Sequence, residues 1–168
     1  IQELAFKPAF DIYKQAVENH SGKIFTKDNF FEIAKGYPFG INKIDTEKVV
    51  RDPLLVGENN SLVCVGEVET GSFVNILTGR NETLIEAAGQ AMQLALKNKS
   101  GDPEKFIFFA DCISRVLFLE DDLNKELEEV ISNYNKVPLF GALTIGEIAN
   151  NGKEYLEFYN KTSVIGCF

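Results

Sequence analysis

The fold is decided by residues 105–115, which read KFIFFADCISR. Four apolar residues in a row, at 106–109, predict a strand over 105–110 that is buried on both faces. Polar residues follow this strand directly, beginning with Asp111. Binding groups in α/β proteins often lie at the end of such a strand. We therefore expect the strand to lie inside a sheet and its polar end to be a candidate site.

The segments on either side of this strand predict two long helices. Residues 81–98 place apolar side chains on one helical face, and residues 121–134 have a second apolar stripe, made by Leu123, Leu127, Val130, Ile131 and Tyr134. A strand over 137–145 follows the second helix. The strand–helix–strand step can be parallel, and would then cross over in the right-handed sense.

The amino-terminal part predicts shorter elements. Helices are expected over 8–20 and 30–34, the second with Thr26 as its N-cap. An antiparallel meander is expected from strands at 49–51, 62–65 and 73–77. At the other end, strands at 155–159 and 163–167 are expected to pair as a hairpin around Asn160-Lys161, and residues 101–103 predict a loop.

These elements predict an α+β fold. We expect a mixed, mostly antiparallel sheet with helices packed on it, two of them long and two shorter and amino-terminal. The 168 residues suit a single domain, 1–168, since domains most often have about 100–150 residues.

Charge and cysteine content exclude several classes of function. The net charge of −8 argues against nucleic acid or an anionic membrane as partner, because phosphates require clustered Lys and Arg. No apolar run approaches the ~18 residues of a membrane span. Three widely spaced cysteines, Cys64, Cys112 and Cys167, are typical of reduced thiols in a cytoplasmic protein.

The common catalytic and cofactor motifs are absent from the sequence. His20 is the single histidine, which excludes a multi-histidine metal site and disfavours a Ser-His-Asp triad. No glycine-rich phosphate loop is present. The acids at 120–122 lie at a predicted helix start, where the helix dipole explains them. We expect no metal, no cofactor and no enzymatic activity.

The first candidate constellation is Asp111, Cys112 and Arg115. The planar guanidinium of Arg115 is suited to binding a carboxylate. Cys112 would be a nucleophile if its pKa were lowered. The alternative is a structural one: a tight strand-to-helix turn with a buried cysteine and an arginine paired to a nearby acid.

The second constellation lies in residues 137–148, which read VPLFGALTIGEI. Gly141 and Gly146 in an apolar strand indicate a bulge or the close approach of another backbone or a ligand. Glu147 stands among apolar residues, where a carboxylate must pair, remain solvated or take up a proton. The alternative is a strand-end glutamate in solvent.

Six short motifs follow one another along the chain, at residues 7–13, 37–41, 50–53, 111–115, 138–148 and 160–162. No single motif is specific, but together they cover most of the chain. In this order they resemble the carboxy-terminal FIST domain, named for F-box and intracellular signal transduction. Thr144-Ile145 departs from the family pattern, where an aromatic residue or serine is expected.

The resemblance implies an intracellular sensory module that binds a small ligand, with amino acids as the suspected class. It also implies an amino-terminal FIST domain in the same chain and a signalling output domain or protein as partners. In our hypothesis Arg115 binds a ligand carboxylate and Glu147 its ammonium group. Asp111, Arg51, Cys112 and Gly146 are further candidate ligand contacts.

Two other functions stay open at this point. The domain can be an interaction module in which Arg115 and Glu147 form a structural ion pair; a cavity of ~300 Å³ or more between them would favour a ligand instead. A Cys112-dependent enzyme is the third alternative, although no base lies beside Cys112 in the sequence.

Overall fold

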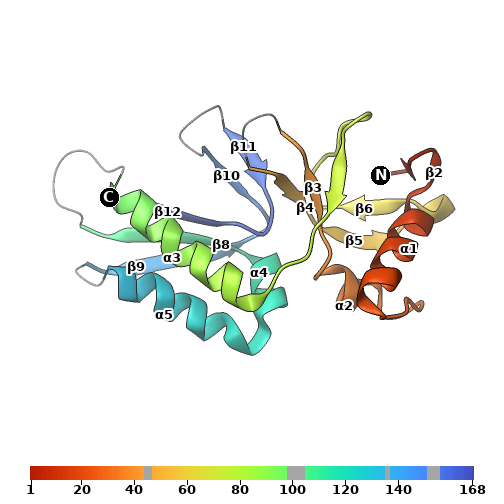
Figure 1. Cartoon of the computed structure of the whole chain (residues 1–168). Helices are drawn as coiled ribbons and strands as arrows, with labels where there is room; N and C mark the ends of the chain where they lie inside the picture. Colours follow the sequence, from red (N-terminus) through yellow and green to blue (C-terminus); the bar gives the residue numbers. More distant parts are fainter. Residues whose placement is uncertain (44–46, 98–104, 135–136, 151–155) are drawn as a thin grey trace. The chain divides into compact units, whose positions relative to one another are not determined.

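The computed structural model describes residues 1–43, 47–97, 105–134, 137–150 and 156–168. The chain divides into two compact units, Ile1–Thr78 and Gly79–Phe168, called unit 1 and unit 2 (Figure 1). The predicted loop at 101–103, the predicted helix end Asn98 and the predicted strand start Tyr155 lie outside the described residues.

The first helix of unit 1, α1 (Ala9–Ser21), follows a short antiparallel pair, β1 (Glu3–Leu4) and β2 (Lys7–Pro8). Its buried residues, Ala9, Tyr13 and Val17, are four apart and therefore share one face. Gly22 ends the helix at φ 70°, a left-handed conformation that glycine adopts without strain. The predicted helix over 8–20 is confirmed.

The second helix, α2 (Phe30–Ala34), also lies where predicted, but its N-cap is Asn29 and not Thr26. The Asn29 side chain accepts a hydrogen bond from the Thr26 backbone N–H at 2.7 Å and donates one to the Ile24 carbonyl at 3.0 Å. The predicted cap is wrong because Asn29 organises the loop that precedes the helix.

The strands of unit 1 form two small antiparallel sheets. In the first, β3 (Phe39–Ile41) lies between β4 (Val49–Arg51) and β7 (Val74–Ile76). In the second, β5 (Pro53–Val56) pairs with β6 (Leu62–Cys64) around the 3₁₀ turn η1 (Glu58–Asn60). The predicted strands at 49–51, 62–65 and 73–77 are confirmed, whereas β3 and β5 were not predicted.

The core of unit 1 is mainly aromatic. The Tyr13 ring centroid lies 5.3 Å from that of Phe39, 5.9 Å from that of Phe25 and 6.2 Å from that of Phe30. The Tyr13 hydroxyl donates a hydrogen bond to the Tyr37 carbonyl at 2.8 Å. The rings therefore supply apolar area while the one polar atom at their centre is satisfied.

Unit 2 is built around β8 (Ile107–Cys112), the strand predicted to be buried. It lies between β12 (Ser163–Cys167), which is antiparallel to it, and β9 (Leu139–Thr144), which is parallel. The step from β8 to β9, which the sequence left open, is parallel. Because β8 is the central strand, neighbours satisfy its backbone on both sides.

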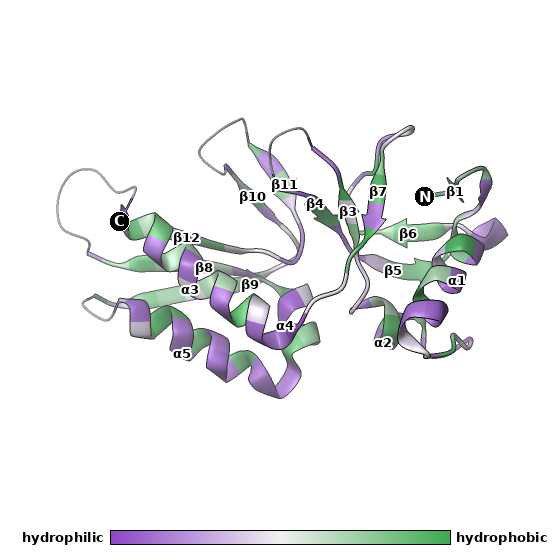
Figure 2. Cartoon of the chain, viewed as in Figure 1, coloured by the Kyte–Doolittle hydropathy of each residue, from purple (hydrophilic) through white to green (hydrophobic). Residues whose placement is uncertain are grey.

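Helices α3 (Asn81–Lys97) and α5 (Leu123–Asn133) pack on one face of this sheet (Figure 1). Figure 2 shows hydrophilic and hydrophobic patches alternating along α5, as expected for a helix with one buried side. The core between helices and sheet consists of Ala88, Met92, Ile107, Phe109 and Val130. Ile131, predicted to be in the stripe, is instead 40% exposed.

Two features of unit 2 differ from the prediction. Helix α4 (Ile113–Leu119) follows β8 without a loop, and the 3₁₀ turn η2 (Glu120–Asp122) joins it to α5. The predicted hairpin at the carboxyl end is wrong, because β11 (Glu157–Tyr159) pairs with β10 (Glu147–Ala149) while β12 pairs with β8. The intervening turn, with Lys161 at φ 57°, therefore separates two pairings.

The architecture is α+β with mostly antiparallel strand pairs, as predicted, but the strands are spread over several small sheets. Within the described ranges, no helix has both the length and the apolar character needed to cross a membrane.

Candidate functional site

A buried cluster of three charged side chains lies where β8 continues into α4. Asp111 is the next-to-last residue of the strand, Arg115 is four residues later in the first turn of α4, and Glu126 is in the first turn of α5. Their exposed fractions are 2%, 3% and 0%. Because no loop separates β8 from α4, Asp111 and Arg115 face each other across one turn of backbone.

Every nitrogen of the Arg115 guanidinium donates a hydrogen bond. Nε donates to Glu126 Oε1 at 2.9 Å and lies 3.2 Å from Asp111 Oδ1. Nη2 donates to the Leu84 carbonyl at 2.8 Å and to Glu126 Oε1, and Nη1 donates to the Lys161 carbonyl at 3.4 Å. The acids that face Arg115 are therefore Asp111 and Glu126.

The cluster contains two carboxyl groups and one guanidinium. Burial and, to a lesser extent, the nearby Glu126 carboxylate together raise the pKa of Asp111 to about 7, against the opposing effects of Arg115 and a hydrogen bond from Ser163. The buried oxygens Asp111 Oδ2 and Glu126 Oε2 have no N–H donor among the described residues. A proton on one carboxyl supplies the donor that they lack.

A cavity of about 210 Å³ lies beside this cluster, between β8, β9 and α5. Among the described residues that line it, Asp111 is the one that carries a charge. The other lining residues are apolar, and include Gly141, where an added Cβ would lie only 1.8 Å from the Phe109 carbonyl oxygen. They are Phe109, Leu123, Leu127, Leu139, Gly141, Ala142 and Leu143.

Glu147 is buried beside the end of β9 and is satisfied by hydroxyl groups. Its Oε1 accepts a hydrogen bond from Thr144 and its Oε2 accepts one from Thr162. Thr144 Oγ1 also lies 3.2 Å from the Asp111 carbonyl oxygen. Glu147 is thus connected to the cluster through Thr144, the residue that departs from the family pattern.

Gly146 allows the turn that places Glu147. Its φ is 89°, and a Cβ there would lie 2.3 Å from the Phe158 ring and 2.9 Å from Asn160 Nδ2. Cys112 is buried next to Asp111, with its Sγ 3.3 Å from Ser114 Oγ. These two predicted residues lie near the cluster but do not line the cavity.

Arg51, the sixth predicted residue, belongs to unit 1. It is buried, and it donates hydrogen bonds to the Glu67 carbonyl at 2.9 Å and to the Val50 carbonyl at 3.0 Å. Within unit 2 the structure brings Asp111 and Arg115 into contact and joins Glu147 to them through Thr144.

Sequence reasoning missed Glu126 and Ser163. Ser163 Oγ donates to Asp111 Oδ1 at 3.1 Å from the neighbouring strand β12. A signal for Glu126 was present, because it stands between Leu123 and Leu127 on the apolar side of the helix. An acid in that position must find a buried partner. No comparable pattern marks Ser163.

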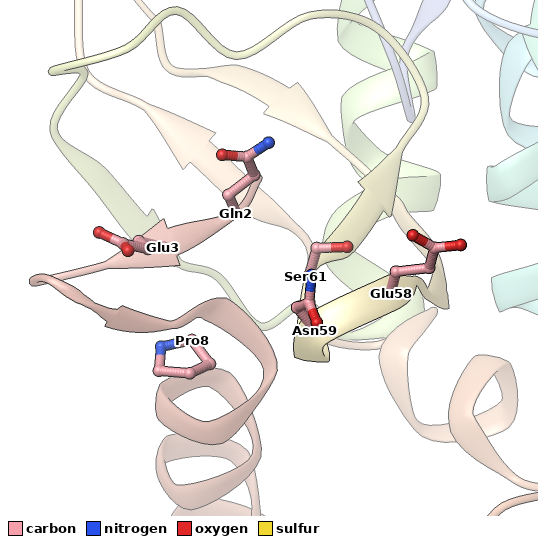
Figure 3. A pocket seen from close by; sticks show the side chains of 6 residues that line it. All are labelled: Gln2, Glu3, Pro8, Glu58, Asn59 and Ser61. Carbon is pink, nitrogen blue, oxygen red and sulfur yellow. The ribbon is translucent and has the colours of Figure 1, made fainter.

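A larger hollow of about 520 Å³ lies in unit 1 (Figure 3). Its two acids, Glu3 on β1 and Glu58 on η1, are exposed and their side chains do not converge in the figure. Its lining is mostly polar and solvated, unlike that of most ligand pockets. The lining residues are Gln2, Glu3, Pro8, Glu58, Asn59 and Ser61.

Metal binding has no support in the described part of the chain. No group of three or more His, Cys, Asp or Glu side chains there is arranged to hold an ion. Asp111 and Glu126 are instead arranged around a guanidinium.

Comparison with known proteins identifies a family. The family model described as the FIST C domain matches residues 9–150, from the start of α1 to just after β10, and includes Asp111, Arg115, Glu126 and Glu147. No curated protein and no solved structure matches the chain.

Proposed function

Because the chain belongs to the FIST C domain family, we propose that it is the sensory module of a cytoplasmic signalling protein and binds a small ligand in the cavity beside Asp111. The observation that carries the proposal is a buried carboxyl with a pKa near 7 at the edge of an apolar cavity. A titratable group in a pocket is typical of binding sites.

The cavity is not the one expected between Arg115 and Glu147, because neither of these residues lines it, and its size suits only a ligand of modest size. Its volume of about 210 Å³ lies below the ~300–1,000 Å³ of pockets for drug-sized molecules. The leucines and Phe109 can pack against an apolar part of a ligand, while the Asp111 carboxylate can accept a hydrogen bond from a donor group of the ligand. Amino acids, the class implied by the family resemblance, are therefore the first ligands to test.

Arg115 supports the site by holding Asp111 and Glu126 in place. Of the six predicted residues, Asp111 carries the proposal, and direct ligand contact by Arg115, Glu147, Cys112, Gly146 or Arg51 stays a prediction. An amino-terminal FIST domain in the same chain and a signalling output domain or protein are the proposed partners.

An interaction module is the second candidate function, favoured by the sheet face opposite α3 and α5. Phe106 stacks on Phe168 at 5.1 Å between ring centroids and lies 5.2 Å from Phe140. Phe140 and Phe168 are 52% and 60% exposed. Exposed aromatic groups of this kind suit a protein partner, and the amino-terminal FIST domain is the proposed one.

Isothermal titration calorimetry on the chain together with its amino-terminal FIST domain tests the first candidate. The ligands are the twenty amino acids and a set of small organic amines and acids. We expect binding by at least one ligand and its loss in Asp111→Asn. Asp121→Asn, which removes an exposed acid, is the matched control. If no ligand binds, the ligand-binding proposal is contradicted and the interaction module is the function that stands.

A further inference from the structure

We propose that the ligand of the cavity beside Asp111 is a small cationic amine with an apolar body and no carboxylate, and that its binding expels a proton held by the Asp111–Glu126 pair. This inference rests on the proposed function and names the ligand class. It differs from the amino acid expected from the sequence.

A ligand carboxylate would have no side-chain donor in the cavity. Arg115 is the residue predicted to bind it, but its Nε and Nη2 are held by Glu126 and its Nη1 and Nη2 by backbone carbonyls. No side chain among the cavity residues carries an N–H or O–H donor when Asp111 is ionised. Burying a carboxylate without side-chain donors is unfavourable.

The buried cluster has a net negative charge when both of its acids are ionised. With both acids ionised, Asp111 and Glu126 carry two negative charges against the single positive charge of Arg115. Two further charged groups lie nearby among the described residues. Lys161 Nζ donates to the Ser114 carbonyl at 3.2 Å and lies 5.2 Å from the Phe118 ring centroid, and the Glu147 carboxyl accepts hydrogen bonds from Thr144 and Thr162. The cluster therefore lacks one positive charge beside the cavity.

The neighbours of Asp111 from the other elements do not supply that charge. Ser163 from β12 donates a neutral hydrogen bond, and Thr144 from β9 donates its hydroxyl hydrogen to Glu147 and lies 3.2 Å from the Asp111 carbonyl oxygen. Cys112 is its chain neighbour. At neutral pH a bound proton fills the deficit, consistent with the raised pKa of Asp111.

Binding of the amine exchanges the proton on Asp111 for an ammonium group. An alkylammonium group that enters the cavity takes the place of the proton: Asp111 releases H⁺ to solvent, and its carboxylate accepts a hydrogen bond from the ammonium. The total charge of the buried cluster is unchanged. The apolar body of the amine then lies against the leucines of α5 and β9.

Leucine offers a matched set of probes. Isopentylamine is leucine without its carboxylate, and 4-methylpentanoate is leucine without its ammonium group. All three share one branched apolar body of a size suited to the cavity. We propose titrating each into the full chain at pH 6.0 and 8.5, in two buffers with different ionisation enthalpies.

We expect isopentylamine to bind at least tenfold more tightly than leucine, and 4-methylpentanoate not to bind. At pH 6.0 the buffer dependence of the heat should report close to one proton released per amine, and at pH 8.5 close to none. Asp111→Asn should lose the proton release and at least tenfold in affinity, whereas Asp121→Asn should match the wild type.

A second variant keeps the test decisive if Asp111→Asn does not fold. Leu143→Phe enlarges a half-exposed cavity residue, the register partner of Asp111 on β9, and leaves all three charged side chains of the cluster in place. We expect it to weaken amine binding at least tenfold while the protein stays folded. Unchanged binding in this variant overturns the assignment of the amine to this cavity.

The outcomes also separate the two proposals. Tighter binding of leucine than of isopentylamine overturns the ligand class while the proposed function stands. Amine binding without proton release at pH 6.0 overturns the exchange with Asp111. Absence of binding by all three probes, together with silence from the full ligand panel, contradicts the proposed function as well.

Discussion

The two units differ in what lies at their buried centres. In unit 1 it is Tyr13 among phenylalanines, whereas unit 2 has, beside its apolar core, a buried charged cluster of Asp111, Arg115 and Glu126. Burial raises the pKa of both Tyr13 and Asp111. Tyr13 is thereby moved further from neutral pH, whereas Asp111 is moved to about 7. The same desolvation makes one group inert and the other titratable.

The two buried groups also differ in whether their polar atoms and charges are balanced. The Tyr13 hydroxyl has its acceptor in the Tyr37 carbonyl, and its ring has aromatic neighbours. The Asp111 cluster has two acids for one guanidinium and lies beside a cavity. We infer that unit 1 has a structural centre and that unit 2 has a centre able to accept another charge.

The strongest test of this difference is Arg115→Met. It leaves two buried acids without their cation, and breaking a buried ion pair in this way costs about 4 kcal/mol. The loss should be smaller at pH 5 than at pH 8, because protons then neutralise the acids. Urea unfolding followed by circular dichroism at both pH values measures it.

The control for Arg115→Met is Lys125→Met, which removes an exposed cation from α5. It should leave the unfolding curve close to that of the wild type. Equal destabilisation by the two variants would contradict the structural role of the buried cluster.

Tyr13→Ala is expected to have the next largest effect. Truncating a buried aromatic ring costs about 3 kcal/mol through lost burial and the resulting cavity. In contrast to Arg115→Met, the loss should be the same at pH 5 and pH 8, because the ring carries no charge. Hydrogen exchange by mass spectrometry should place the loss of protection in α1 and β3.

Tyr13→Phe separates the ring from its hydroxyl. It removes only the hydrogen bond to Tyr37 and should cost about 1 kcal/mol. A pH-dependent loss in either Tyr13 variant would remove the contrast between the two units.

The last expected effect is the contribution of Asp111 to the pH dependence of stability, which accumulates over the roughly three pH units between its two pKa values. Its pKa is about 7 in the folded chain and about 3.9 in an unfolded one. The folded state therefore binds more protons between these values, and stability falls as pH rises, by up to about 1.4 kcal/mol per pH unit. Above about pH 7 the contribution of Asp111 should be constant.

Asp111→Asn isolates that contribution. The difference between the unfolding free energies of wild type and variant should decrease from pH 4 to pH 7 and then level off. A difference that does not change with pH would show that Asp111 titrates normally, and the contrast with Tyr13 would be lost.

Much of the fold could be predicted because long periodic patterns report burial directly. The helices at 9–21 and 81–97 and the strand β8 all follow from apolar spacing. β3 was missed because it is three residues long and lies among residues typical of turns. The hairpin of β11 with β12 was predicted wrongly because two strands adjacent in sequence found different partners.

The candidate site was predicted in part for the same reason. Asp111 and Arg115 could be proposed because polar residues after a buried apolar strand are a local signal. Glu126 is eleven residues from Arg115 and Ser163 is fifty-two from Asp111. Their convergence depends on packing between elements and has no signature in sequence spacing.

The sequence by itself determined the class of fold, the central buried strand, the family and the point in the chain where polar residues follow that strand. These follow from local patterns, since burial selects residue types along a single element. Only the tertiary structure decided that Arg115 is held by Glu126 and that Asp111 is the charged residue beside the cavity. Those outcomes depend on which helices and strands pack together, because a buried charge takes its partner from whatever element lies within hydrogen-bonding distance.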